Sequence, residues 1–238
     1  MAPKIVWDEI SKRFYETGVD HGVLYVADPD TGTYPKGVAW NGLTTVTEKP
    51  SGAAAAPQYA DNIKYLNLIG LEEFAASVAA FTYPDEFEAC DGSEQVLVGV
   101  GLGQQVRSMF GLVYRSGIGN DVVGENLGYK LHLIYGCVAA PSQKAYATVN
   151  ATPAPIDFSW EITTTPIPVS GHRPVSCLTI DSTKANATNL AALEVILFGV
   201  AAVTAVPDAT PPITAVTAVE GRLPLPDEVI ALMTPAGS

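Results

Sequence analysis

The three histidines are the residues of this chain best suited by type to acid–base or metal chemistry. His21, His132 and His172 lie far apart in the sequence, and none falls in the HxxxH or HExxH spacing that brings two imidazoles to one metal ion. No Gly-x-Ser-x-Gly motif marks a nucleophilic serine. We therefore predict no catalytic, cofactor-binding or metal-binding residue, and we interpret His132 as a surface or interface side chain.

The three cysteines, Cys90, Cys137 and Cys177, are an odd number without a CxxC pair. Such a set indicates neither a disulfide framework nor a zinc site. We interpret them as buried free thiols.

A glycine-rich stretch, Gly99-Val-Gly-Leu-Gly103, has the beginning of a phosphate-binding loop. The dinucleotide fingerprint requires another glycine three residues after the second one, and Gln104 stands there instead. No Lys-Ser or Lys-Thr pair follows, as a Walker-type loop needs. The stretch is predicted to be a turn or bulge between strands.

Acidic side chains form a cluster in one region, and they outnumber basic side chains over the whole chain. Glu72, Glu73, Asp85, Glu86 and Glu88 would do acid–base chemistry only if burial separated their pKa values, and a solvated turn is the simpler interpretation. The chain carries 13 basic and 25 acidic residues, a formal charge of −12, without a basic run. This balance argues against specific binding of a phosphate backbone.

Period-two alternation of apolar and polar residues recurs along the chain and predicts a mainly β fold. The clearest strand has Ile156, Phe158, Trp160 and Ile162 on one side, and Asp157, Ser159, Glu161 and Thr163 on the other. Further strands are predicted at 14–26, with a kink near Gly18 and Gly22, and at 38–47, 106–114, 129–137 and 177–181. The stretches 59–69 and 74–83 are interpreted as two more extended segments, the second ended by Pro84.

One helix is predicted, over about 184–198. Asp181 or Ser182 is its candidate N-cap and Gly199 its stop. Within it, Leu190, Leu193, Ile196 and Leu197 share one face, which predicts that this face packs on the sheet.

The elements divide the chain into an N-terminal arm at 1–12, one β domain at 13–199 and a Pro/Ala/Thr-rich linker with a docking tail at 200–238. A long loop at 27–56 interrupts the domain, and such loops are usually functional or mobile. The sequence shows neither an apolar run of about 18 residues nor a signal-peptide pattern at its start. We expect synthesis in the cytoplasm and no membrane insertion.

Several short motifs together carry a resemblance to a known family. They are FYETG at 14–18, GVLY at 22–25, WNG at 40–42, YADNIKY at 59–65, TYPDEF at 82–87, GLVY at 111–114, YKLHLIYG at 129–136, FSW at 158–160 and LTIDST at 178–183. From about residue 12 to residue 199, the chain resembles the major tail tube proteins of long-tailed, non-contractile bacteriophages. The alanine run at 53–56 and the chain after Val200 fit the family pattern poorly.

The resemblance implies a tail-tube-type β-sandwich or barrel with one flanking helix and long loops and termini, assembled as hexameric rings that stack into the tail tube. Its partners would be identical subunits, the tape-measure protein in the lumen, and the tail terminator and tail-tip proteins. DNA would pass through transiently and without specificity. The resemblance implies no enzyme activity and no cofactor, and a location in the virion tail after assembly in the host cytoplasm.

Two sets of residues become candidate sites under this resemblance. The polar strand face, whose carboxylates would repel phosphate, is the candidate lumen wall: Asp157, Ser159, Glu161 and Thr163. The long loop, expected to reach a neighbouring subunit or ring together with both termini, contributes Asp28, Asp30, Tyr34, Trp40 and Lys49.

A second class of protein fits the same composition. A monomeric β-sandwich that binds carbohydrate or another surface ligand would use Trp7, Trp40 or Trp160 as stacking platforms. Ring or tube formation separates the two hypotheses.

Overall fold

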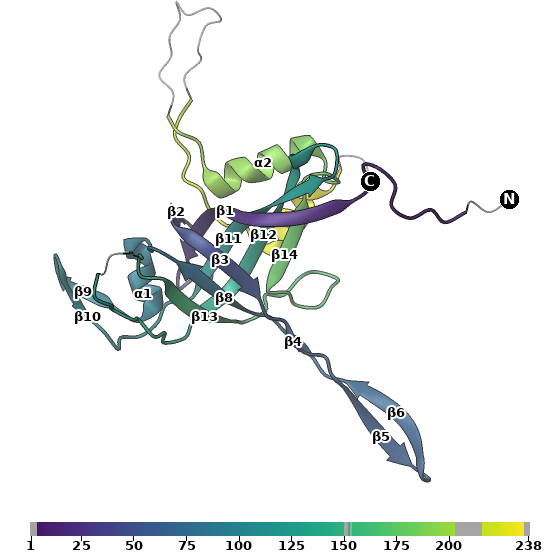
Figure 1. The fold of residues 1–238 in the computed structure, drawn as a ribbon. Helices are drawn as coiled ribbons and strands as arrows, with labels where there is room; N and C mark the ends of the chain where they lie inside the picture. Colours follow the sequence, from purple (N-terminus) through teal and green to yellow (C-terminus); the bar gives the residue numbers. More distant parts are fainter. Residues whose placement is uncertain (1–3, 150–151, 153, 203–215, 236–238) are drawn as a thin grey trace, which may run out of the picture.

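The computed structural model describes residues 4–149, 152, 154–202 and 216–235. The fold is mainly antiparallel β, as predicted (Figure 1). Its main sheet has the order β2-β1-β11-β12-β13-β8-β3, and β14 also pairs with β12. These strands span Phe14–Val26 (β1), Gly37–Ala39 (β2), Leu43–Glu48 (β3), Ala75–Ala80 (β8), Phe110–Asn120 (β11), Gly124–Ala139 (β12), Phe158–Thr164 (β13) and Cys177–Asp181 (β14).

Strand β12 forks the sheet into two layers. Its residues 130–134 pair with β14, whereas its residues 137–139 pair with β13. The bend falls at Gly136, whose φ of 63° favours glycine, and a Cβ there would collide with the carbonyl oxygen of Thr165. One layer is therefore β1-β11-β12-β14, and the other is β3-β8-β13.

The β2–β3 connection brings the two layers together at their other side. The Trp40 N–H donates to the Gly22 carbonyl oxygen at 2.8 Å, so β3 follows directly from a strand paired with β1. Strand β1 turns between the layers through two register shifts, at Gly18 (φ 72°) and His21 (φ 50°). The predicted kink in this strand is confirmed, and the result is a sandwich that nearly closes into a barrel.

Aromatic side chains fill the core between the layers. Trp160 of β13 is fully buried, and its ring centroid lies 5.8 Å from that of Trp40 and 5.0 Å from that of Phe87. Trp40 also donates its indole N–H to the Thr82 carbonyl oxygen at 3.0 Å. Phe87 belongs to a short helical segment formed by the turn Asp85–Phe87 and helix α1 (Glu88–Asp91), so the motif at 82–87 is a plug for one end of this core.

Helix α2 (Ala187–Phe198) covers the outer face of the β1-β11-β12-β14 layer (Figure 1). Leu190, Leu193 and Leu197 are buried there, as the spacing predicts. The predicted N-cap was wrong: Asn186 caps the helix, accepting from the backbone N–H groups of Thr188 and Asn189. Asp181 instead ends β14 and uses its carboxylate to accept from Thr183.

A second flanking helix, α3 (Pro226–Met233), corrects the prediction of a single helix. It packs with α2, and both Leu223 and Val229 are buried in the same cluster. The Tyr135 hydroxyl donates to the Pro224 carbonyl oxygen at 3.0 Å, which fixes the segment onto β12. The described part of the docking tail therefore docks on its own subunit, whereas Pro207, Pro211 and Pro212 of the predicted linker lie outside the described residues.

Two hairpins stand out from the body (Figure 1). The longer one, here called the arm, consists of β4 (Ser51–Gly52), β5 (Ala55–Ala60), β6 (Ile63–Ile69) and β7 (Glu72–Glu73). The shorter one, here called the β9–β10 hairpin, consists of β9 (Glu94–Leu97) and β10 (Val100–Leu102). The stretch 99–103, predicted to be a turn, is only partly one: Gly99 lies in the turn of this hairpin, whereas Val100–Leu102 form β10.

The arm corrects two interpretations made from the sequence. The stretch 59–69 is not one extended segment, because Asp61 (φ 51°) and Asn62 (φ 63°) form a tight turn between β5 and β6. The predicted loop at 27–56 contains β2, β3 and the first side of the arm. The sequence analysis missed this turn because it is formed by Asp-Asn and not by the commoner Asn-Gly, and because apolar residues lie on both sides of it.

Candidate assembly surfaces

The outward face of the β3-β8-β13 layer carries the predicted polar strand face. Ser159, Glu161 and Thr163 are exposed on β13, and Asp157 is exposed just before it. Across the ladder these residues face small or hydroxylated side chains: Ala75, Ser77 and Ala79 of β8, and beyond them Thr45 and Thr47 of β3. The alternation predicted from the sequence is confirmed, and it produces a smooth surface without a large apolar side chain.

An ion pair compensates one of the two carboxylates on this face. Lys49 Nζ donates to Glu161 Oε1 at 2.7 Å, and both side chains remain about half exposed. Asp157 keeps its charge and accepts at 3.4 Å from the Thr44 hydroxyl. The face is therefore nearly neutral, which differs from the strongly acidic wall expected from the net charge of the chain.

The candidate contact residues of the long loop are not brought together. Asp28 accepts from the Asp30 backbone and the Thr31 hydroxyl in a local turn, and the hydrogen bond from Thr31 is the main cause that lowers the Asp28 pKa. Tyr34 and Trp40 are 2% and 3% exposed. Both aromatic rings are core residues, so the prediction that they contact a neighbouring subunit was wrong, because their loop folds back onto the sheet.

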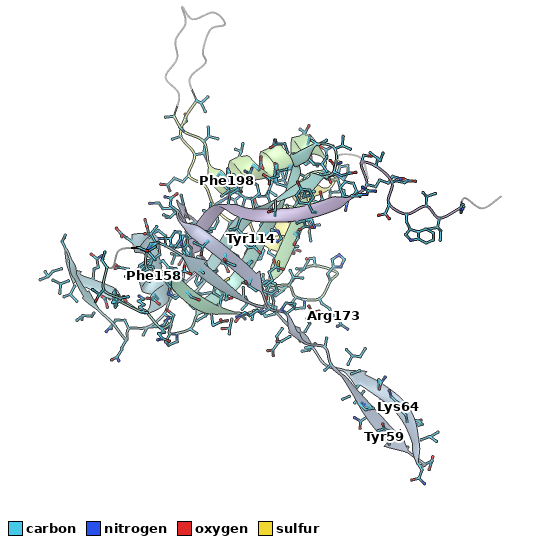
Figure 2. The ribbon with its side chains drawn as sticks, viewed as in Figure 1. Tyr59, Lys64, Tyr114, Phe158, Arg173 and Phe198 are labelled. Carbon is cyan, nitrogen blue, oxygen red and sulfur yellow. The ribbon has the colours of Figure 1, made fainter. Side chains whose placement is uncertain are left out.

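The arm is the most exposed apolar segment of the described chain. Every residue of β5 and β6 is exposed, and the two strands pair only with each other. Figure 2 shows Tyr59 and Lys64 at the far end of the arm, away from the body. Its large apolar side chains are 40–79% exposed: Tyr59, Ile63, Tyr65, Leu66, Leu68, Ile69 and Leu71. A lone two-stranded hairpin is marginal in water, and an exposed apolar patch of this kind is typical of an interaction site.

The root of the arm is held firmly by the body. Glu48, the last residue of β3, accepts from the Tyr114 hydroxyl at 2.6 Å, and its Oε1 lies 3.1 Å from His132 Nδ1. On the returning strand, the Thr164 hydroxyl donates to the Phe74 carbonyl oxygen at 2.6 Å. The arm is thus a projection from a fixed base.

The contacts of His132 also place a serine, a histidine and a carboxylate in series. Ser116 Oγ lies 2.9 Å from His132 Nε2, and Glu48 occupies the other side of the ring. The His132 side chain is only 12% exposed and its ring stacks on Tyr114 at 4.6 Å, so of the two predicted settings, surface or interface, the exposed surface was wrong. No sequence spacing could have joined these residues, because they come from three different strands.

Burial and a shared acceptor determine the electrostatics of this series. Burial is the main cause that lowers the His132 pKa, and the Glu48 carboxylate acts in the opposite direction. The same Glu48 oxygen is shared with the Tyr114 hydroxyl, and Ser116 lies within the β11–β12 ladder opposite Lys130. A serine nucleophile needs backbone donors arranged around an oxyanion, as at a strand end or a sharp turn. The series ties β3, β11 and β12 together at the root of the arm.

The β9–β10 hairpin is a second apolar projection that sequence reasoning interpreted only as a turn. Val98 at its tip is fully exposed, and Val96, Leu97, Val100 and Leu102 are 49–68% exposed. Its base is anchored at Asp91, which accepts from the Trp160 indole at 3.0 Å and from Lys144 at 2.7 Å. The sequence signal that could have revealed this projection is the apolar run VLVGVGLG at 96–103, which contains no cation.

The β1-β11-β12-β14 layer ends in two strands that pair on one side only. The first half of β1 pairs with β11, whereas β2 pairs only with residues 23–25 of β1. Strand β14 pairs only with β12. Unpaired backbone groups at such edges are templates for a strand of another chain.

The remaining sequence predictions concern single residue types. Among the described residues the three cysteines form no disulfide, and burial raises the pKa of Cys90 to about 12 and that of Cys177 to about 11. Over the same residues, no group of three potential metal ligands gathers. No helix in the described part of the chain is long and apolar enough to cross a membrane.

Of the three tryptophans proposed as stacking platforms, Trp40 and Trp160 are buried, and only Trp7 is exposed, at 75%. Two of the three platforms of the binding-module hypothesis are thus unavailable to a ligand.

A scan of known protein families finds no model that matches this chain, and a search of curated proteins finds no significant relative. The functional argument therefore rests on the surfaces described above and on the sequence motifs.

Proposed function

We propose that this protein is a self-assembling structural subunit, the major tail tube protein of a long-tailed, non-contractile phage. The observation that carries the proposal is the arm, because a two-stranded hairpin with apolar side chains on both faces and no contact with the body implies a binding surface on another chain. The resemblance of the sequence motifs supplies the specific assembly: hexameric rings stacked into a tube.

The open edges of the β1-β11-β12-β14 layer support ring formation. The layer has four strands, and each pairs antiparallel with the next. With an even number of strands, β14 and β1 run in opposite directions, so a second copy added head to tail continues the antiparallel pattern. A contact of this kind closes into a ring when the rotation between copies permits.

The polar face of the β3-β8-β13 layer supports a conduit for the genome. Small hydroxylated side chains and a compensated Lys49–Glu161 pair present neither cations that bind phosphate nor apolar groups that bind bases. We propose this face as the lumen wall, contacted first by the tape-measure protein and then by DNA in transit. Tail terminator and tail-tip proteins would close the two ends of the tube, and the virion tail is the proposed location.

Negative-stain microscopy and sedimentation of the purified chain test the proposal. The wild-type protein is expected to form rings and long tubes of uniform width, with or without tail initiator proteins. A variant in which residues 54–70 are replaced by a short Gly-Ser turn should keep the fold of the body and lose stacking. A concentrated wild-type protein that stays monomeric even with initiator proteins present contradicts the proposal.

A further inference from the structure

The two projecting hairpins leave opposite ends of the same strand. Strand β8 begins at Ala75, directly after the arm stem, and after its end at Ala80 the chain passes through Asp85–Phe87 and α1 to the β9–β10 hairpin. In Figure 1 the two hairpins accordingly project from different sides of the body. Both bases are anchored to the body, through Glu48 to Tyr114 of β11 and through Asp91 to Trp160 of β13, so their relative position is fixed.

Both hairpins need the same kind of partner. Each consists of two strands that pair only with each other, and each exposes apolar side chains along its length. A lipid surface is a poor partner for the β9–β10 hairpin, since both of its edges carry unpaired backbone groups that hydrocarbon cannot satisfy. A protein strand satisfies both the backbone and the apolar side chains.

One ion pair is available between the two hairpins. Glu94 is the single charged residue of the β9–β10 hairpin, and Lys64 is the single cationic residue of the arm strands. Lys64 lies at the tip of the arm, beside the Asp61–Asn62 turn. The arm also carries Asp61 in its turn and Glu72 and Glu73 in its stem, so Lys64 is its one side chain that can form an ion pair with Glu94.

We propose that the β9–β10 hairpin receives the tip of the arm from a second copy of this chain. The contact is head to tail, because a surface at one end of β8 meets a different surface beyond the other end of β8 in the next copy. Such heterologous contacts repeat without limit when no rotation closes them, so this pair determines how successive layers of subunits are joined. The inference rests on the proposed function and adds the receiving surface that the function requires.

Cysteine cross-linking between two variants tests the contact. Tyr65→Cys places a thiol on the arm and Val98→Cys places one on the hairpin tip, at side chains that are 69% and 102% exposed. Mixed and mildly oxidised, differently tagged copies of the two variants should give a mixed disulfide dimer. Val122→Cys, in the exposed β11–β12 turn, is the matched control for the hairpin variant, and the wild-type protein controls for the native thiols.

A charge exchange gives a second readout that does not depend on oxidation. Lys64→Glu and Glu94→Lys should each weaken stacking about three-fold per contact, as an exposed ion pair allows, and the double variant should restore it. Equal cross-linking to Val122→Cys, or normal tubes without a link between Tyr65→Cys and Val98→Cys, overturns the inference and leaves the proposed function intact. A wild-type chain that stays monomeric overturns both.

Discussion

Strands β13 and β6 are both seven residues long, yet they have opposite environments. In β13 buried and exposed residues alternate, and the strand has β12 and β8 on its two sides. In β6 every residue is exposed, apolar side chains occur on both faces, and β5 is its only neighbour. Alternation marks a strand whose core lies within its own chain. Apolar residues without alternation, on a lone hairpin, leave apolar surface that the chain itself does not cover, and we propose that another chain covers it.

The largest effect that sharpens this comparison comes from matched truncations in the two strands. Trp160→Ala, in β13, removes a fully buried ring and should lower the free energy of unfolding by about 3–5 kcal/mol. Tyr65→Ala, in β6, removes a ring that is 69% exposed and should change the free energy of unfolding by about 0.5 kcal/mol or less. Urea unfolding of the unassembled chain measures both. Similar losses for the two variants would show that the arm belongs to the folding unit.

The sequence predicted the strands that have their own core and missed the features that depend on remote contacts. Alternation located β13, and the helix face at Leu190 and Leu193 located α2. The fork of β12 at Gly136, the burial of Tyr34 and Trp40, and the meeting of Glu48 with His132 depend on residues far apart in the chain. Local patterns carry no information about such pairs. The tight turn at Asp61 was missed because the apolar residues on both sides of it were interpreted as one continuous strand.

A smaller effect is expected at the N-terminus of α2. This helix packs on the body and not on the arm, so the effect concerns only the part of the chain that has its own core. Asn186→Ala leaves the backbone N–H groups of Thr188 and Asn189 without their acceptor, and it should cost about 1 kcal/mol of stability. Thermal unfolding of the unassembled protein measures the loss. Asn189→Ala, in the first turn of the same helix, removes only an exposed side-chain hydrogen bond of 3.3 Å to the Thr234 carbonyl oxygen and should cost less. An Asn186 variant as stable as wild type would show that packing alone sets the start of the helix.

The smallest effect concerns pH at the root of the arm. Burial lowers the His132 pKa in the folded protein, so the unfolded chain binds more protons between its ordinary pKa of about 6.5 and the folded value. Stability should therefore be complete above that ordinary value and decline as pH falls below it, despite opposition from Glu48. His132→Gln should flatten the dependence of the urea midpoint on pH between about 7.5 and 5, whereas the exposed His172→Gln should retain it. A wild-type midpoint that rises over this interval as pH falls contradicts the assignment.

If the chain assembles into the proposed tube, the fork in β12 has a mechanical consequence. Because one continuous backbone belongs to both layers, a pull on the arm passes from β8 and β13 into β12 across the three residue pairs that join Cys137–Ala139 to β13. From there it follows the covalent chain into the layer that carries the open edges. On this route, tension along the long axis and tension around the circumference would meet in β12, and Gly136 is the point where the direction of force changes. A second route leads from the other side of the arm through β3 and β2 into β1.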